Sequence, residues 1–180
     1  MPVTPFHLGP GLAIKSVTGR RFSLLMFGIA QVAIDIEPGV GMLTRASTLH
    51  GWSHTYVGAA VIGTLVLFLG RPICEWILKW WNAELRRNRL DWLAGPDGIG
   101  WGAATAGAYI GTFSHVALDS IMHFDMRPYA PLSDANGLLG AISTEALYGV
   151  CIASGIIGAA IWFAVQLRRK HLQHLQETPR

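Results

Sequence analysis

The sequence predicts an all-α protein: a polytopic membrane bundle of about four helical spans, with one further amphipathic helix on the membrane surface. Hydrophobic residues make up 51 % of the 180 residues and charged residues only 14 %, whereas an ordinary soluble domain carries about 25 % charged residues. The apolar residues occur in blocks, and glycine is frequent within them, as membrane helices that pack closely require. We therefore expect a single integral-membrane domain over residues 1–180.

Four segments are candidates for crossing a bilayer, which takes roughly 17–25 mostly apolar residues. They are 22–36, 56–69, 99–122 and 146–167. The first is short and reaches Asp35, and the second would run on through Arg71 and Pro72. The alternative is a soluble helical protein with buried helices, but apolar runs of this length are rare in soluble folds.

The distribution of lysine and arginine predicts the direction of the spans, because cytoplasmic loops carry an excess of both. With both termini in the cytoplasm, only Arg45 and Arg127 lie outside. Twelve of the fourteen basic residues then lie inside: Lys15, Arg20, Arg21, Arg71, Lys79, Arg86, Arg87, Arg89, Arg168, Arg169, Lys170 and Arg180. The basic residues thus predict a multi-pass membrane protein with both termini cytoplasmic and a cytoplasmic tail at 168–180.

The segment 73–93, "ICEWILKWWNAELRRNRLDWL", alternates tryptophan with basic residues. This pattern is typical of an amphipathic helix on the inner leaflet, with indole rings at the headgroups and cations facing anionic lipid. A nucleic-acid surface is the alternative interpretation. The interleaved tryptophans and the flanking spans argue against it, so we expect membrane lipid and no nucleic acid as partner.

On this topology, imidazoles and carboxylates from separate segments reach the same, outer, membrane face. Asp35 and Glu37 end the first span, and Glu145 starts the last. The other histidines and aspartates of this face precede the second span or end the third: His50, His54, His115, Asp119, His123 and Asp125. Because the topology was derived from lysine and arginine alone, this convergence is a partly independent observation.

The spacing within these segments predicts a metal site. His115, Asp119 and His123 are four residues apart, and each such step turns a helical side chain by only ~40°, so all three would share one face. His50 and His54 have the same spacing. Neutral imidazole and carboxylate are good zinc ligands, and a catalytic zinc site typically takes three protein ligands. Two such clusters could hold one metal or two.

Each residue also has a structural interpretation. A histidine near the membrane surface can hydrogen-bond a neighbouring helix, and an aspartate at a helix end can be a cap. Asp119 is harder to explain in this way, because it lies within a helical pattern where an ionised group is costly. His7 lies either on the inner side or on a half-helix that brings it to the site. We assign His171 and His174 to the solvated tail.

Four motifs together resemble the YdjM-like family of bacterial inner-membrane metal-dependent hydrolases. They are "TPFHLGPGLAIK", "IDIEP", "LHGWSHTYVGA" and "SHVALDSIMHFDMRPYAP". The resemblance implies a multi-pass membrane hydrolase with His50, His54, His115 and Asp119 as core site residues, and His7 and Asp35 as additional ones. More distantly, the spacing is similar to zinc-dependent phospholipase C. The chain departs from that pattern because it lacks a late HxxxE, with only Glu145 at that place.

The leading functional prediction is a metal-dependent hydrolase at the outer face, acting on a phospholipid or another amphipathic ester. A divalent metal, most plausibly zinc, would lower the pKa of bound water. Asp35 or Asp125 would be the general base, and Arg127 would bind a phosphate. The metal ligands would come from His50, His54, His115, Asp119, His123 and His7, with Asp35 able to join them.

Two other classes of function stay open. His115 and Asp119 could form a proton relay in an ion-coupled transporter subunit, although no inverted repeat or broken helix pair is visible. The chain could also be a non-catalytic membrane scaffold whose polar contacts only hold helices together. Ser53 and Ser114 each precede a histidine, but no order of nucleophile, base and orienting residue is apparent.

Overall fold

The computed structural model describes residues 4–46 and 48–177, which are helical without any strand. The predicted all-helical class is thereby confirmed. The α-helices are α1 (Thr4–Thr18), α2 (Leu24–Ile34), α3 (Ile36–Thr44), α4 (Tyr56–Leu65), α5 (Arg71–Arg87), α6 (Trp101–Met122) and α7 (Thr144–Glu177). Short turns of helix lie at Gly19–Arg21 (η1), Trp52–His54 (η2), Val66–Gly70 (η3, a π-helical stretch) and Asp91–Leu93 (η4).

Three helical stretches of the described residues are long and apolar enough to cross a membrane. They are Leu24–Thr44, Tyr56–Arg87 and Thr144–Leu172. Each overlaps one predicted span, and the second does run on through Arg71 and Pro72. The other predicted span, 99–122, is present as helix α6 but is not among the three.

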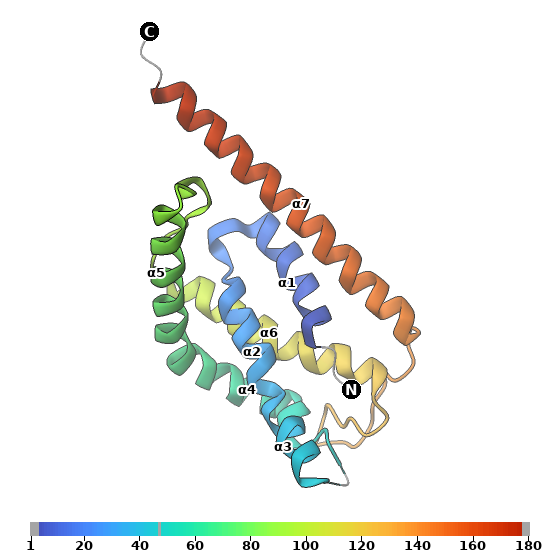
Figure 1. The fold of residues 1–180 in the computed structure, drawn as a ribbon. Coiled ribbons are helices and arrows are strands. Elements are labelled where there is room, and N and C mark those ends of the chain that lie inside the picture. Colours follow the sequence, from blue (N-terminus) through green and yellow to red (C-terminus); the bar gives the residue numbers. More distant parts are fainter. Residues whose placement is uncertain (1–3, 47, 178–180) are drawn as a thin grey trace.

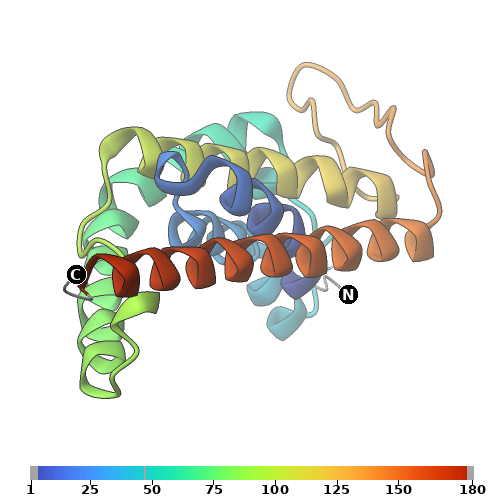
Figure 2. The same cartoon turned by 90° about the horizontal axis from the view of Figure 1, so that it is seen from above.

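Helix α1 packs along α7, as the two views in Figures 1 and 2 show. The sequence permits this close approach because small residues line the contact. A Cβ added at Gly9 would overlap the carbonyl oxygen of Cys151 on α7. At Gly158 on α7, a Cβ would lie 2.6 Å from the backbone nitrogen of Ala13. Helix α1 in turn packs on α2, where a Cβ at Gly11 would overlap the ring of Phe27, and this contact places His7 relative to the rest of the bundle.

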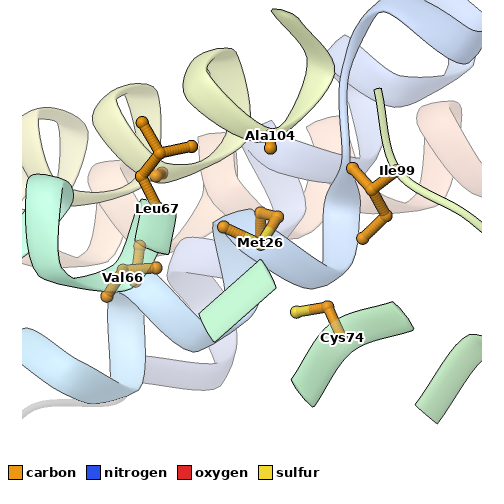
Figure 3. Close-up of a cluster of buried hydrophobic side chains, with 8 residues drawn as sticks. Met26, Val66, Leu67, Cys74, Ile99 and Ala104 are labelled. Carbon is orange, nitrogen blue, oxygen red and sulfur yellow. The ribbon is translucent and has the colours of Figure 1, made fainter. Parts of the chain in front are cut away.

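Helix α2 packs against α6 and also contacts the continuous α4–α5 stretch. Together these contacts form the main apolar core. Figure 3 shows Met26 of α2 among Val66, Leu67, Cys74 and Ala104. Ser23 caps α2, since its side-chain oxygen accepts from the amide of Met26 (3.3 Å). This packing holds α2 and α6 side by side, and both helices deliver side chains to the site.

The segment predicted to lie on the membrane surface, 73–93, forms most of α5, continuous with α4 through the π-helical stretch η3. Trp76, Trp80 and Trp81 are exposed on it. The turn after α5 is fastened to it, because the amide nitrogen of Asn82 donates to Asp97 (2.6 Å) and Arg86 pairs with the same carboxylate (3.2 Å). Helix α5 and the chain leading to α6 thus form one unit.

A long connection from His123 to Ser143 joins α6 to α7 and bears on the site. The amide of Tyr56, at the start of α4, donates to the carbonyl of Pro128 (2.8 Å). Asn136 donates to the carbonyl of Ser120 near the end of α6 (2.9 Å). The connection therefore folds back over the ends of α4 and α6, where the polar residues gather.

Candidate metal centre

Four buried or half-buried side chains from three segments form what we call the primary cluster: Asp35, His54, His115 and Asp119. Asp35 lies at the break between α2 and α3, His54 ends η2, and the other two lie on α6. One ligand atom of each residue lies within 4.8 Å of those of the other three. Such a group of imidazoles and carboxylates could hold a metal ion.

His115 and Asp119 project from the same face of α6, as their spacing predicts. Nε2 of His115 lies 3.2 Å from Oδ2 of Asp119 and 3.2 Å from Oδ1 of Asp35. Nε2 of His54 lies 3.5 Å and 3.6 Å from the same two oxygens. His54, His115 and Asp119 are fully buried, while the side chain of Asp35 is 15 % exposed.

These distances match the edges of a tetrahedral metal site. Zinc–nitrogen and zinc–oxygen distances of about 2.0–2.1 Å place neighbouring ligand atoms about 3.3 Å apart in a tetrahedron. The nitrogen–oxygen separations in the primary cluster run from 3.2 to 3.6 Å. Although it faces two carboxylates, Nε2 of His115 has no hydrogen-bond geometry to either. The donor set therefore fits a shared cation better than a hydrogen-bonded ring of side chains.

Gln31 of α2 determines which nitrogen of His115 faces the cluster. Its side-chain nitrogen donates to the carbonyl of Gly111 (3.2 Å), which leaves Oε1 as an acceptor 2.6 Å from Nδ1 of His115. A neutral His115 must then carry its proton on Nδ1 and direct the lone pair of Nε2 at Asp35 and Asp119. Metal-binding histidines usually have their other ring nitrogen held in this way.

The local structure of "HGWSH" orients His54. Glu37 accepts hydrogen bonds from the backbone amides of Trp52 (3.2 Å) and Ser53 (2.6 Å). A Cβ at Gly51 would overlap this carboxylate, so a larger residue there would displace the Glu37 side chain. Oγ of Ser53 lies 2.8 Å from Nδ1 of His54, which leaves Nε2 to face the carboxylates. The two histidines of this motif do not share an α-helix, since only Trp52–His54 is helical and is 3₁₀.

His7 reaches the primary cluster, which the sequence left open. Its Nε2 lies 3.6 Å from Oδ1 of Asp119, the oxygen that faces away from His54 and His115. Its ring contacts that of His115 edge to face, with centroids 5.0 Å apart. Burial lowers the pKa of His7 to about 4 even though Asp119 opposes the shift, so its imidazole is neutral at physiological pH.

A second group, here the secondary cluster, comprises His50, His123 and Asp125. The expectation that His123 shares a helix face with His115 and Asp119 is wrong. Helix α6 ends at Met122, and His123 caps it with extended backbone (φ −111°, ψ 124°). Its ring instead stacks on that of His50, with centroids 4.3 Å apart. Asp125 contacts Nδ1 of His50 at 2.8 Å.

The charge states outside the predicted spans are set by burial and by neighbouring charges. Burial lowers the pKa of His54, but the carboxylates of Asp119 and Asp35 outweigh it and the net pKa is raised. Burial and the adjacent His50 lower the pKa of His123. Burial raises the pKa of Asp125, yet the hydrogen bond from His50 lowers it below its ordinary value.

Two residues with important contacts were not assigned to the site from the sequence. Gln31 is a lone amide in the apolar run "FGIAQVAI", and that isolation is the one signal that could have identified it. Glu37 was placed at the outer face but given no role. By contrast, the proposed phosphate ligand Arg127 is exposed and pairs with Asp134 (3.3 Å), so its substrate role stays a prediction.

The fold and the site define a helical protein with membrane-length apolar helices and a buried cluster of histidine and aspartate that could hold a metal. Comparison with protein-family models, with curated proteins and with solved structures found no match to this chain. Its function therefore has to be inferred from the chemistry of its own side chains.

Proposed function

We propose that the protein is a membrane-bound metal-dependent hydrolase that cleaves a phosphoester or lipid-like ester at the outer face of a bacterial inner membrane. The observation that carries the proposal is the convergence of Nε2 of His115 with a carboxylate oxygen of Asp35 and of Asp119, at 3.2 Å each and without hydrogen-bond geometry. Two carboxylates and an imidazole lone pair repel one another in a buried site unless a metal ion or a proton lies between them.

The residues of the primary cluster fit zinc, which takes imidazole and carboxylate ligands in tetrahedral sites. When bound, such an ion polarises an ester oxygen and lowers the pKa of water. Asp119 is fully buried and serves as a ligand. Asp35 is the donor that solvent reaches; it would hold the ion through one oxygen and accept a proton from water through the other. Asp125, the other candidate base, is engaged with His50 through both oxygens.

An apolar cavity supports a lipid-like substrate. It has a volume of about 1000 Å³ and lies among α1, α2 and α7. Its lining includes Leu12, Val32 and Ile156, and it extends to Gln31 and Ile36. Gln31 contacts His115 and Ile36 follows Asp35, so the cavity adjoins the primary cluster. A hydrocarbon chain lying in the cavity would bring an attached ester group to the cluster.

The membrane arrangement belongs to the same proposal. We propose that α6 is a fourth span despite its lower hydropathy, because its polar residues Thr112, His115, Asp119 and Ser120 are all buried and are shielded from lipid. Both termini would be cytoplasmic, as the lysine and arginine distribution predicts. The exposed tryptophans of α5 would lie at the headgroups of the inner leaflet.

The resemblance to the YdjM-like hydrolases agrees with this proposal and is independent of the computed distances. Its motifs contain all four primary-cluster residues and His7. Under the proposal, Arg127 would have to exchange Asp134 for a substrate phosphate, since the two side chains are paired and exposed.

The proposal is tested by assaying the purified protein in lipid nanodiscs, with zinc or manganese, on phospholipids and on a soluble phosphodiester. We expect metal-dependent cleavage that Asp35→Asn reduces by about 10²–10⁴-fold, the range for loss of a general base. Asp91→Asn, which changes an exposed carboxylate of η4 away from the site, is the control. Bound metal without cleavage of any ester would favour a structural metal and the scaffold alternative.

A further inference from the structure

More buried donor atoms gather here than one ion can use. Within the described residues, buried atoms without a protein hydrogen-bond partner include both ring nitrogens of His7, both carboxylate oxygens of Asp119, and Nε2 of His50, His54, His115 and His123. A tetrahedral ion at the primary cluster takes Nε2 of His54 and His115 and one oxygen from each aspartate. Nε2 of His50 and Nε2 of His123 remain, together with the ring nitrogens of His7 and the second oxygen of Asp119. Each unsatisfied buried polar atom costs about 1–3 kcal/mol.

The two histidines that carry these nitrogens belong to one compact group. The histidine rings of the secondary cluster stack with centroids 4.3 Å apart and planes 27° from parallel. Ligand atoms of His50, His123 and Asp125 lie within 4.8 Å of one another. The rings come from different segments, one before α4 and one at the end of α6, so their meeting is a product of the tertiary fold.

Asp125 holds His50 in the orientation of a metal ligand. Its Oδ1 lies 2.8 Å from Nδ1 of His50, and its Oδ2 accepts from the backbone amide of His50 at 3.3 Å. A carboxylate at one ring nitrogen fixes the proton there and leaves the other nitrogen with a lone pair, which is the usual arrangement behind metal-bound histidine. The other nitrogen of His50 is buried, as is required of an inward-facing donor.

The secondary cluster adjoins the primary one. The ring of His50 lies edge to face with that of His54, with centroids 4.9 Å apart. Asp119 presents its second oxygen to His7 and thus carries negative charge beyond the primary cluster. A second cation would therefore lie beside an anionic group and among imidazole rings.

We propose that Nε2 of His50 and Nε2 of His123 bind a second divalent cation next to the primary cluster, with Asp125 positioning His50. Imidazole ligands select a transition metal such as zinc or cobalt over magnesium or calcium. The inference rests on the proposed metal centre for its first ion. The YdjM-like resemblance assigns neither His123 as a ligand nor Asp125 as the residue that positions His50.

The test is the metal content of the purified full-length protein after equilibration with zinc and removal of unbound metal. We expect two zinc ions per chain in the wild type and one in His123→Phe, which keeps an aromatic ring for stacking and removes the donor. The control, His171→Phe, replaces an exposed histidine of α7 and should retain two. Circular dichroism and size-exclusion chromatography establish that each variant is folded.

A second variant gives a result even if the first variant does not fold. Asp125→Asn should keep the backbone contact but weaken zinc at one site by about 10–100-fold, as loss of a supporting carboxylate does, and leave the other site unchanged. One zinc in the wild type, or two in both folded variants, would show that His50 and His123 are an ordinary stacked pair. A wild type without any metal would overturn the primary centre as well, so the two failures are distinguishable.

Discussion

Nδ1 of His115 lies 2.6 Å from Oε1 of Gln31, and this contact determines which nitrogen of the ring faces the primary cluster. The amide orientation is set in turn by the carbonyl of Gly111. Both side chains are fully buried, so water does not compete for the contact. Gln31 is thus a positioning residue, which acts through His115 rather than on a substrate.

Replacing Gln31 should weaken metal binding without removing a ligand. We expect Gln31→Leu to lower zinc affinity by about 10–100-fold, measured by competition with a chelator, because Nδ1 of His115 loses its partner. Gln31→Glu, which still offers an acceptor to Nδ1 of His115, should retain much of the wild-type zinc affinity. Gln166→Leu, a change of a buried glutamine on α7, is the control. Equal affinity in the wild type and Gln31→Leu would rule out the positioning role.

The raised pKa of His54 predicts opposite pH trends with and without metal. Burial lowers this pKa, but Asp119 and Asp35 raise it above the ordinary value of 6.5. Protonated His54 therefore stabilises the metal-free fold fully below pH 6.5, and this stabilisation is lost as the pH rises through the raised value. Metal needs the neutral ring, so its stabilisation grows over the same range.

Thermal unfolding in detergent measures these trends. We expect the unfolding midpoint of the metal-free protein to fall from pH 6.5 upward, and that of the zinc-loaded protein to rise. His54→Gln should flatten the first trend and diminish the second. A metal-free midpoint that increases with pH across this interval would contradict the assigned charge pairing.

The packing of α1 against α7 predicts a sharp difference between two glycines. A Cβ at Gly9 overlaps the carbonyl oxygen of Cys151, whereas a Cβ at Gly28 meets only Leu8 Cδ2, at 3.7 Å. Gly9→Ala should lower the free energy of unfolding by about 1–3 kcal/mol, as overpacking does. Gly28→Ala should be neutral or gain up to about 1 kcal/mol, since alanine favours helix. Denaturant unfolding compares them, and equal stability of both variants would show that α1 and α7 are not in this register.

The apolar cavity predicts a dependence on chain length. Ile156 lines the cavity and the neighbouring Ile157 does not, although both side chains are exposed. Ile156→Trp should lower kcat/KM for a long-chain ester by roughly tenfold, a loss of about 1.4 kcal/mol of binding, and leave a short soluble ester unaffected. Ile157→Trp should change neither. Equal losses on both substrates would mean that the cavity does not hold the hydrocarbon chain.

The sequence was most informative where a regular helix carries the polar residues. The four-residue spacing of His115 and Asp119 places both on one face of α6, and the structure confirms that geometry. The same rule failed for His123, because it assumed that the helix continues past Met122. Helix ends depend on tertiary contacts, here those made by the connection to α7, which local periodicity does not report.

The rest of the cluster depends on contacts between distant segments. His7 meets Asp119 where α1 packs against α2 and α6, and Gln31 meets His115 across the α2–α6 packing. The span count shows a related limit. Helix α6 has low hydropathy because it carries polar side chains, and it buries them against the other helices. Composition alone therefore does not distinguish a span from a helix in the core.

The central claim, a cation held by Asp35, His54, His115 and Asp119, is tested most directly by Asp119→Asn, which keeps the size of the side chain and removes its charge. X-ray absorption at the zinc edge of the purified wild type should show nitrogen and oxygen ligands at about 2.0–2.1 Å, and the variant should lose the primary ion. A wild type without bound transition metal, or an Asp119→Asn protein with an unchanged spectrum and metal content, would contradict the claim.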